Sequence, residues 1–324
     1  MKAVLCKSLD GPDGLVIEDI PDPVAGPGQV VVRVSAAALN FFDTLIIAGK
    51  YQTKPPLPFS PCGEIAGVIA SVGPDVAQWQ AGQRVMAYLG YGGARELVVV
   101  DARRLIAIAD GVSCVIASGL SITYGTAVHG LRDRADLQRG ESVAILGASG
   151  GAGLAAVEVA KLLGARVIAV ASSADKLRVC RDHGADETVL AAADDLKEGL
   201  RGLTQGQGVD VVYDCVGGSL AEPAVRALAW KGRYLVIGFA SGDIPRLPLN
   251  LLLLKGASAV GVFWGEAVAR DPDGHRANSA RVMDGVASGV LRPHVHKLLP
   301  LEAIREGLEL LSQRRATGKV VLTL

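Results

Sequence analysis

The chain is poor in aromatic residues, in cysteines and in net charge. Phe, Trp and Tyr make up 4% of its 324 residues although 50% are hydrophobic, so its cores must be built mainly from Ala, Val, Leu and Ile. Lys and Arg total 33, as do Asp and Glu, and this balance gives no electrostatic reason to expect nucleic acid as a partner. The five cysteines are scattered and never form a C-x-x-C pair, which argues against a disulfide framework and a zinc ribbon: Cys6, Cys62, Cys114, Cys180 and Cys215.

Segments typical of export or membrane insertion are also lacking. The first residues, MKAVLCKSLDGPDG, have no apolar stretch behind their lysine and do not resemble a signal peptide. The apolar segment 247–264 is interrupted by Asn250, Lys255 and two glycines, which makes it a poor membrane span. We therefore expect a soluble, cytoplasmic protein with no membrane partner.

Residues 1–118 have the pattern of a mainly β domain. Short runs rich in β-branched residues alternate with Gly- and Pro-rich turns such as PDPVAGPGQ and KPPLPFSP. Strands are predicted at 30–39, 64–73, 83–89 and 94–100. We expect a partly barrel-shaped domain here.

From residue 119 to 264 strands alternate with helices, which predicts right-handed crossovers and a parallel sheet. Six strands are expected at 141–148, 165–172, 187–191, 209–217, 233–240 and 258–264, with helices at 150–164, 174–184, 194–203 and 220–230. This is the pattern of a doubly wound, six-stranded Rossmann sheet that binds a dinucleotide. The last strand is expected at the sheet edge, where it could pair with a second subunit and form a homodimer. Residues 265–324 end in a strand at 318–324 and are expected to return to the first domain.

The strongest local signal is LGASGGAG at 146–153, between a predicted strand and a predicted helix. Gly147, Gly150 and Gly153 are spaced G-x-x-G-x-x-G, with Gly151 added. Residues without a Cβ let backbone N–H groups approach a pyrophosphate at a helix N-terminus. A tight turn without a ligand is the alternative, but the strand–turn–helix context favours cofactor binding.

The residues after the second strand of this sheet favour NADPH over NADH. NAD sites usually place an acid there to hold a ribose 2′-hydroxyl. Here the strand ends Val170-Ala171-Ser172-Ser173, and Ser173 and Lys176 offer a hydroxyl and a cation to a 2′-phosphate. Lys176 could instead be an ordinary exposed lysine without a role in binding. The absence of an acid after this strand is the observation that favours NADPH.

Several motifs spread over the whole chain resemble the medium-chain dehydrogenase/reductase superfamily, and specifically its zinc-free quinone oxidoreductase (zeta-crystallin-like) branch. They are AAALNFFDTLIIAGKY (36–51), LPFSPCGEIAGVIASVG (57–73), GQRV (82–85), GASGGAGLAAVEVAKLLGA (147–165), VDVVYDCVGG (209–218) and GKVVL (318–322). The resemblance implies a GroES-like catalytic domain over 1–118, a Rossmann domain over 119–264 and a C-terminal segment, 265–324, that completes the catalytic domain.

The same resemblance implies that no zinc is bound. Zinc alcohol dehydrogenases of the superfamily have a cysteine ligand where this chain has Asn40 and a histidine ligand where it has Gly63. Their four-cysteine lobe has no counterpart in the segment 86–100. Catalytic zinc needs three protein ligands, and Cys62 with Glu64 is an incomplete set. His294 and His296 could share a strand face and chelate a metal, but two solvated histidines are the favoured interpretation.

The resemblance also assigns roles to individual residues. Asn40 and Thr126 are expected near the nicotinamide, and Gly147, Gly150, Gly151, Ala152 and Gly153 around the pyrophosphate. Further cofactor contacts are expected from Ser173, Lys176, Val216, Phe239 and Arg315. Asn40 could donate a hydrogen bond to a substrate carbonyl or, equally, hold its own loop, and Tyr51 is a candidate proton donor. Asp43 is expected to be structural, because nothing in the sequence indicates a raised pKa. The family often has a tyrosine at the positions of Leu45 and Ala191, and both are absent here.

We therefore expect an enzyme that transfers a hydride from NADPH to a quinone or an α,β-unsaturated carbonyl without zinc, since such acceptors need little polarisation. Two alternatives stay open. One is a reductase of enoyl thioesters such as acryloyl-CoA, for which Arg103, Arg104, Arg270 and Arg276 could hold the CoA phosphates. The other is a protein that binds NADPH without turnover.

Overall fold

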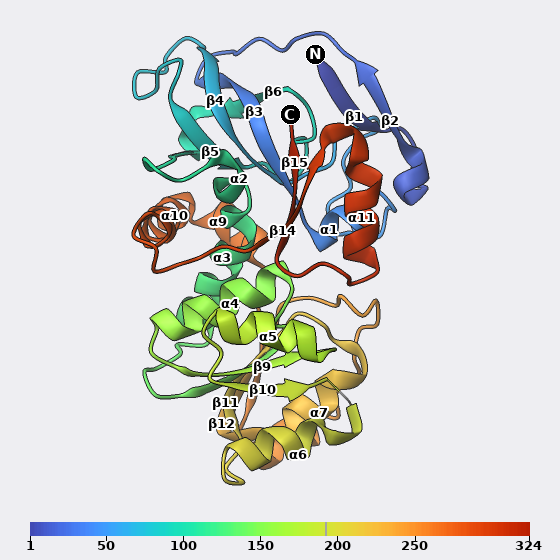
Figure 1. Ribbon diagram of the computed structural model, residues 1–324, viewed down its shortest axis with the longest axis vertical. Helices are drawn as coiled ribbons and strands as arrows, with labels where there is room; N and C mark the ends of the chain where they lie inside the picture. The colour runs from blue at the N-terminus through green and yellow to red at the C-terminus, as the bar shows by residue number, and fades with distance from the viewer. Residues whose placement is uncertain (192) are drawn as a thin grey trace. The chain divides into compact units, whose positions relative to one another are not determined.

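The computed structural model describes residues 1–191 and 193–324, which divide into two compact units. Unit 1 contains Met1–Ile122 and Asp271–Leu324, and unit 2 contains Thr123–Arg270 (Figure 1). The boundaries expected from sequence fall after residues 118 and 264, and those of the units after 122 and 270. In the described part of the chain, no helix combines the length and the apolar character needed to cross a membrane.

Unit 2 is built on a parallel six-stranded sheet with the strand order β10-β9-β8-β11-β12-β13. This is the order of a doubly wound dinucleotide-binding fold, which confirms the predicted fold class. The strand predicted to be outermost, β13, does lie at one edge. The bounds are β8 Ser142–Leu146, β9 Arg166–Ala171, β10 Glu187–Leu190, β11 Val209–Asp214, β12 Leu228–Val236 and β13 Ser258–Gly261.

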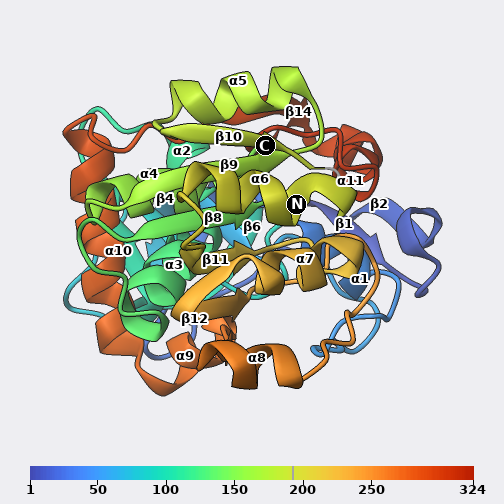
Figure 2. The ribbon, with the colours of Figure 1, turned by 90° about the horizontal axis from the view of Figure 1, so that it is seen from below.

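Helices cover both faces of this sheet because its strands are apolar on both sides. Alternate strand residues such as Ala144, Leu146 and Ile168 pack in one cluster with Leu196 of α6 and Ala224 of α7. Helices α4 and α5 lie on the opposite face (Figures 1 and 2). The helices of unit 2 are α4 Gly151–Leu162, α5 Ala174–Asp182, α6 Ala193–Leu203, α7 Ala221–Arg226, α8 Asn250–Lys255 and α9 Trp264–Arg270, and α3 Leu120–Val128 starts at the unit boundary.

Two predicted elements of unit 2 are displaced. The helix expected at 220–230 ends at Arg226, and β12 begins at Leu228, which already pairs with Val209 of β11. The strand expected at 233–240 ends at Val236, because the N–H groups of Ile237 and Gly238 turn to the carbonyl of Asp214. Pairing with the neighbouring strand therefore decides both ends of β12.

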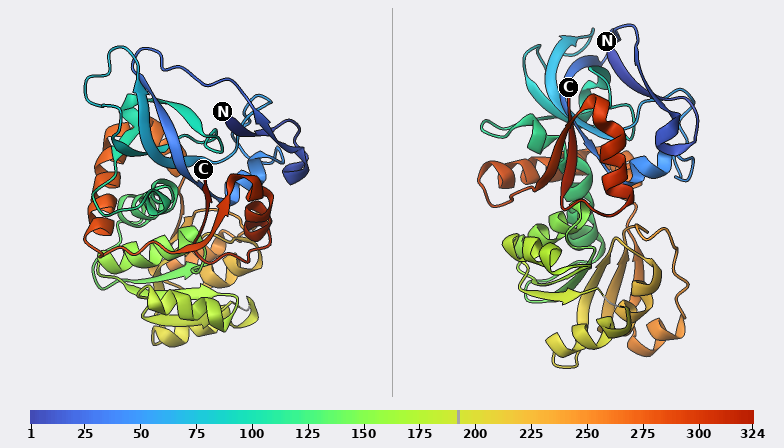
Figure 3. Two further views of the ribbon diagram at one scale, coloured as in Figure 1. Left: turned by 45° about the horizontal axis from the view of Figure 1, so that its top comes forward. Right: turned by 45° about the vertical axis from the view of Figure 1, so that its right-hand side comes forward.

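Unit 1 contains a seven-stranded sheet and a separate hairpin of β1 and β2. The path of the large sheet is β14-β15-β3-β4-β5-β7, and β6 pairs with β3. The C-terminal strand β15 runs antiparallel to β3, so the last residues of the chain complete a sheet whose other strands, apart from β14, come from residues 29–107 (Figure 3). The bounds are β1 Lys2–Cys6, β2 Leu15–Asp19, β3 Gln29–Leu39, β4 Glu64–Val72, β5 Arg84–Tyr88, β6 Leu97–Asp101, β7 Leu105–Ala107, β14 Val295–Pro300 and β15 Lys319–Thr323.

The core of unit 1 lies between this curved sheet and α11, with residues such as Val32, Ile65 and Leu308 in a single buried cluster. Its make-up is the mainly β, GroES-like domain expected from the sequence. One predicted strand starts late: residues 94–96 precede β6, and Ala94 bonds to Pro61 and Val4 instead. The helices are α1 Phe41–Ile46, α2 Cys114–Ala117, α10 Pro272–Ala287 and α11 Ile304–Ser312.

Candidate functional site

The glycine-rich turn joins β8 to α4 in unit 2, as the sequence predicts. Gly147 has a φ of +71°, a conformation that favours glycine, and Gly150 is the N-cap of α4 with an extended backbone. The cap supplies no side-chain hydrogen bond, so the first N–H groups of this twelve-residue helix, from Gly151, Ala152 and Gly153, have no capping side chain. Such a helix end attracts anions.

Each glycine of this turn has a different reason to be there. A Cβ on Gly153 would lie 2.2 Å from the carbonyl oxygen of Gly147 and 2.6 Å from the Cα of Ala148. This turn therefore has room only for glycine at position 153. A Cβ on Gly150 would meet nothing closer than 3.5 Å. Packing within the protein therefore requires Gly153 but not Gly150, and a ligand lying against the turn would explain the second glycine.

The end of β9 carries a cluster of two hydroxyls and one ammonium. Ser173 is the N-cap of α5, and its Oγ accepts from the N–H of Lys176 at 3.4 Å. The Nζ of Lys176 donates to the Oγ of Ser172 at 3.2 Å. The structure thus brings Ser173 and Lys176 together and adds Ser172. Its position four residues before Lys176 in the sequence could have indicated that contact.

The loop after β11 packs directly on the glycine-rich turn. A Cβ on Gly147 would lie 2.9 Å from Cγ2 of Val216, and one on Gly217 would lie 2.8 Å from Cδ1 of Phe239. Val216 therefore lies beside Gly147 of the turn, and Phe239 lies beside Gly217, the residue after Val216. Sequence reasoning missed Asp214.

The buried Asp214 carboxylate holds this loop. It accepts from the N–H groups of Val216, at 2.7 Å, and Gly217, at 2.9 Å, and from the hydroxyl of Tyr234. Burial raises the pKa of the Asp214 carboxyl, while these three donors counteract the rise. An acid that ends an apolar strand just before a glycine pair, in VDVVYDCVGG, is the signal that could have identified it.

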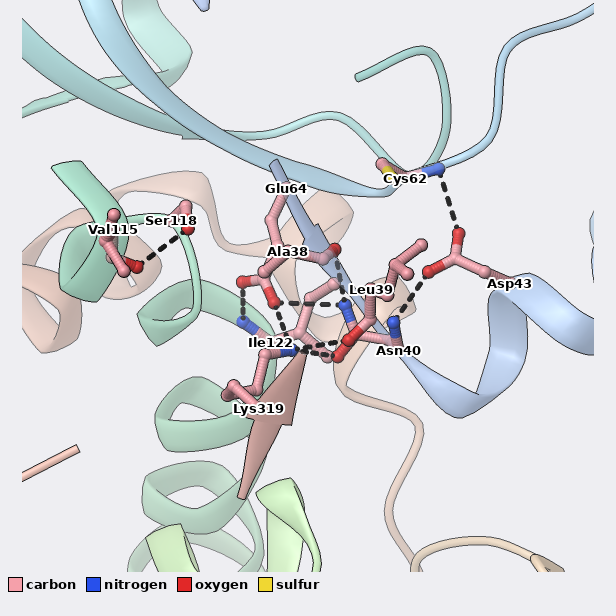
Figure 4. A network of polar contacts seen from close by, with 10 residues as sticks. All are labelled: Ala38, Leu39, Asn40, Asp43, Cys62, Glu64, Val115, Ser118, Ile122 and Lys319. Atoms are coloured by element: carbon pink, nitrogen blue, oxygen red, sulfur yellow. Dashed lines mark hydrogen bonds and ion pairs between the residues drawn. The ribbon is translucent and has the colours of Figure 1, made fainter. Parts of the chain in front are cut away.

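In unit 1, Asn40 lies in a buried polar network that was not predicted (Figure 4). Its Oδ1 accepts from the Nζ of Lys319 at 2.7 Å, and its Nδ2 donates to Oε1 of Glu64 at 3.0 Å. Lys319 and Glu64 form a buried ion pair at 2.9 Å, and Oε2 of Glu64 accepts from the N–H of Ile122 at 2.9 Å. The sequence had left open whether Asn40 bonds to a substrate or to its own surroundings, and in this structure its amide bonds to its surroundings.

Asp43 lies beside Asn40 and has the structural role that was expected, but its pKa is not the unperturbed value that the sequence suggested. Its carboxylate accepts from the N–H groups of Asn40, at 2.8 Å, and Cys62, at 3.0 Å, which ties the start of α1 to the loop before β4. Burial raises the pKa of this carboxyl to about 7 despite those bonds and the charge of Lys319. The assumption of an unperturbed pKa was therefore wrong, because the sequence did not reveal that this position is fully buried.

The other predicted residues take varied positions. The half-buried ring of Tyr51 stacks on Phe42 at 5.4 Å, and burial raises the pKa of its phenol, which weakens it as a proton donor at neutral pH. Thr126 is half-buried on α3 of unit 2, and Arg315 is exposed in unit 1 between α11 and β15. Leu45 is half-buried in α1, without a polar group to offer a substrate.

The residues at the zinc-ligand positions of related alcohol dehydrogenases, Asn40 and Gly63, make close contacts within unit 1. A Cβ on Gly63 would lie 2.6 Å from Cζ of Phe42 and 3.0 Å from the carbonyl oxygen of Gly90, so a histidine there would require both neighbours to move. Oδ1 of Asn40 and Oε1 of Glu64 accept from the Lys319 ammonium, and Oε2 of Glu64 accepts from the N–H of Ile122. Across residues 1–191 and 193–324, no three His, Cys, Asp or Glu side chains gather closely enough to hold a metal ion.

The fold and the turn define a two-unit protein of the dinucleotide-binding class, and comparison with known proteins specifies its family. The family model for a GroES-like alcohol dehydrogenase domain matches residues 26–110, and that for a zinc-binding dehydrogenase matches residues 151–276. Quinone oxidoreductase-like protein 2 homolog of Nematostella vectensis is 38% identical over 99% of this chain and 88% of its own length. Quinone oxidoreductase of Pseudomonas aeruginosa is 32% identical over 99% of both.

Solved structures agree with these relatives. The Escherichia coli quinone oxidoreductase, determined as a complex with NADPH, superposes with a TM-score of 0.92 at 26% identity over the full length of both chains. The chain belongs to the medium-chain dehydrogenase/reductase superfamily, in its zinc-free quinone oxidoreductase branch. This confirms the resemblance found in the sequence, and the protein is an oxidoreductase of that superfamily.

Proposed function

We propose that this protein binds NADPH and transfers a hydride from it to a quinone or an α,β-unsaturated carbonyl compound. The observation that carries the cofactor assignment is the contact of Lys176 with Ser172 at the end of β9. Two hydroxyls and an ammonium stand there in place of the acid that an NAD site presents. A 2′-phosphate would receive charge-assisted hydrogen bonds from Lys176 and from the hydroxyls of Ser172 and Ser173.

The remaining cofactor contacts follow from unit 2. The N–H groups of Gly151, Ala152 and Gly153 bind the pyrophosphate at the N-terminus of α4, and Gly150 leaves it room to approach. Val216 supplies apolar surface beside Gly147, and Phe239 does so beside Gly217. Thr126 and Arg315 stay proposed contacts on the strength of the family resemblance alone.

When bound, NADPH supplies the hydride, and the protein's residues bind and orient the reactants. Asn40 is proposed to contact the reacting part of the bound molecules. The raised pKa of Tyr51 disfavours this phenol as an acid near pH 7, so we propose that the proton reaching the reduced acceptor comes from water.

We further propose that the reaction does not use zinc. The steric contact at Gly63 and the engagement of Asn40 and Glu64 with Lys319 support this. Without a metal to polarise a simple ketone, acceptors whose conjugation spreads the developing negative charge are favoured. Stoichiometric zinc in the purified protein, measured by elemental analysis, would overturn this part of the proposal.

An acceptor screen tests the function. The purified protein is titrated with NADPH and with NADH, and oxidation of each is then followed with 1,4-benzoquinone, an α,β-unsaturated ketone, crotonyl-CoA and acryloyl-CoA. The proposal predicts tighter binding of NADPH and turnover with the quinone or the ketone. Turnover confined to the CoA thioesters would instead identify an enoyl-thioester reductase. Tight binding with no turnover of any acceptor would identify an NADPH-binding protein without this activity.

We also propose that two copies associate through the β13 edge of unit 2. Within the described residues, β13 has β12 as its only strand partner, and on its other edge the carbonyl of Gly261 accepts from Nε of Arg134 at 3.2 Å. Leu253 and Leu254 of the neighbouring α8 are 79% and 72% exposed, and the ring of Trp230, 70% exposed, lies near Gly256 at the end of this helix. Two such edges can pair antiparallel about a twofold axis and cover this apolar surface.

A further inference from the structure

The buried ion pair of unit 1 bears directly on what Asn40 can do. Lys319, the first residue of β15, is 7% exposed, and Glu64, the first residue of β4, is 1% exposed. The ammonium has three hydrogens and three acceptors: the carbonyl of Leu39 at 3.1 Å, Oδ1 of Asn40 at 2.7 Å and Oε1 of Glu64 at 2.9 Å. Its hydrogen-bonding capacity is therefore fully used inside the protein.

These partners determine which way the Asn40 amide faces. An ammonium can only donate and a carboxylate can only accept, so the amide oxygen must face Lys319 and the amide nitrogen must face Glu64. The nitrogen donates to Oε1 of Glu64 at 3.0 Å and, over a longer 3.4 Å, to the carbonyl of Ala38. Both of its hydrogens point into the protein, so the atom of this side chain that can meet a ligand is Oδ1, which accepts from Lys319 and takes part in a capping box with the N–H of Asp43 at the start of α1.

Residues of the segment before and at the start of α3 contact both members of the Lys319–Glu64 ion pair. The stem of Lys319 passes over Gly119, where a Cβ would lie 3.1 Å from Cε and 3.2 Å from Cγ. On the other side, the N–H of Ile122 holds Oε2 of Glu64, so the carboxylate is fixed at both oxygens (Figure 4).

We propose that Lys319 and Glu64 are positioning residues that fix the Asn40 amide, so that Asn40 accepts a hydrogen bond from a hydroxyl or amide N–H of the bound cofactor or substrate. This rests on the proposed function and changes one part of it. Asn40 recognises a donor group and does not donate to the acceptor carbonyl, which was one of the two roles that the sequence left open.

The first test measures the amide without any ligand or activity. The sequence contains only three asparagines, Asn40, Asn250 and Asn278, so selective 15N-Asn labelling gives three side-chain amide signals. The Asn40 signal, assigned with Asn40→Ala, is expected to exchange slowly with water. The double variant Lys319→Met/Glu64→Gln avoids leaving one buried charge unpaired, and it should make this signal broaden or exchange at least ~10-fold faster. An Asn40 signal that the double variant leaves unchanged would overturn the proposal.

The second test asks whether the pair acts on turnover through Asn40. Asn40→Ala alone, and Lys319→Met/Glu64→Gln alone, should each lower kcat/KM for the best acceptor by about 10- to 100-fold. When Asn40→Ala is added to the double variant, kcat/KM should fall further by less than about 3-fold, because the ion pair no longer holds the amide that this substitution removes. Lys319→Arg keeps the cation and should recover part of the loss. Fully additive losses in kcat/KM would contradict the positioning role, as would equal kcat/KM in the wild type and the double variant.

Failure of the proposed function is distinguishable from failure of this inference. If the wild type oxidises NADPH with none of the acceptors in the screen, the NMR experiment still decides whether the ion pair fixes the amide. The affinity of the same variants for NADPH, measured by titration, then replaces kcat/KM as the second readout. A fall in melting temperature without a change in the Asn40 signal would mean that the pair only stabilises the fold.

Discussion

A methyl group on Gly153 would lie 2.2 Å from the carbonyl oxygen of Gly147, whereas one on Gly150 would be 3.5 Å from that same atom. The two positions are three residues apart in one turn, so they separate the demands of packing from those of a ligand. Gly153→Ala should lower the free energy of unfolding by at least ~2 kcal/mol, because the backbone must move to admit the methyl group.

Gly150→Ala should fold normally and lose cofactor. Its φ of −75° suits any residue, so the free energy of unfolding should stay within about 1 kcal/mol of wild type. Its methyl group would point at the pyrophosphate and should weaken NADPH binding at least ~10-fold. Thermal unfolding and fluorescence titration measure the two quantities. Unchanged NADPH affinity in Gly150→Ala would remove the turn from the cofactor site.

Lys176→Ala tests the choice of cofactor. Loss of a charge-assisted contact to the 2′-phosphate should weaken NADPH binding by about 10- to 100-fold and leave NADH binding nearly unchanged. Arg178→Ala is the matched control, since Arg178 is an exposed cation on the same helix whose salt bridge is with Asp175. Calorimetric titration with both cofactors gives the comparison. Equal losses for NADPH and NADH would exclude Lys176 from the specificity.

The raised pKa of the Asp43 carboxyl predicts that the stability of the protein falls as the pH rises toward neutrality. Its pKa is about 7 in the folded protein, chiefly through burial, whereas an unfolded aspartate releases its proton near pH ~4. The folded state therefore holds this proton more tightly than the unfolded state does. The resulting contribution to the free energy of unfolding is complete below about pH 4. It is lost as the pH rises to about 7, a loss of up to ~4 kcal/mol.

The variant Asp43→Asn isolates this contribution from other titrating groups. It cannot ionise, so its destabilisation relative to wild type, measured by urea unfolding, should be larger at pH 5 than at pH 8. The exposed Asp110→Asn serves as the control and should show the same small effect at both values. Equal destabilisation by Asp43→Asn at the two pH values would refute the raised pKa.

The apolar surface of α8 predicts the oligomeric state. We expect the wild type to sediment as a dimer and Leu253→Glu/Leu254→Glu as a monomer, because burying two carboxylates at an apolar interface is unfavourable. Leu162→Glu places one such carboxylate on the exposed end of α4 and should leave the dimer intact. A wild type that sediments as a monomer, or a double variant that stays dimeric, would exclude this interface.

The sequence allowed much of unit 2 to be predicted because its signals are local. Strand, glycine-rich turn and helix follow one another over residues 141–164, and the missing acid after β9 is visible in four consecutive residues. The ends of β12 could not be predicted, because pairing with β11 extends that strand back to Leu228.

The polar network around Asn40 was out of reach for the opposite reason. Glu64 and Lys319 are 255 positions apart, and neither stands in a pattern that marks it as buried. Their pairing depends on β15 joining β3 in the sheet of unit 1, which orients Lys319 toward the end of β3. The inward-facing amide of Asn40 follows from that long-range packing, whereas the raised pKa of Asp43 follows from its own burial.

The most direct test of the central claim is the fate of the C4 hydrogen of NADPH. Two preparations, each carrying deuterium on one face of C4, are oxidised by the protein with an α,β-unsaturated ketone, and the product is analysed by mass spectrometry. We predict that one preparation delivers a single deuterium to the carbon β to the carbonyl and reacts more slowly than unlabelled NADPH, while the other delivers none. A product free of deuterium from both preparations, with no isotope effect on the rate, would contradict hydride transfer by this protein.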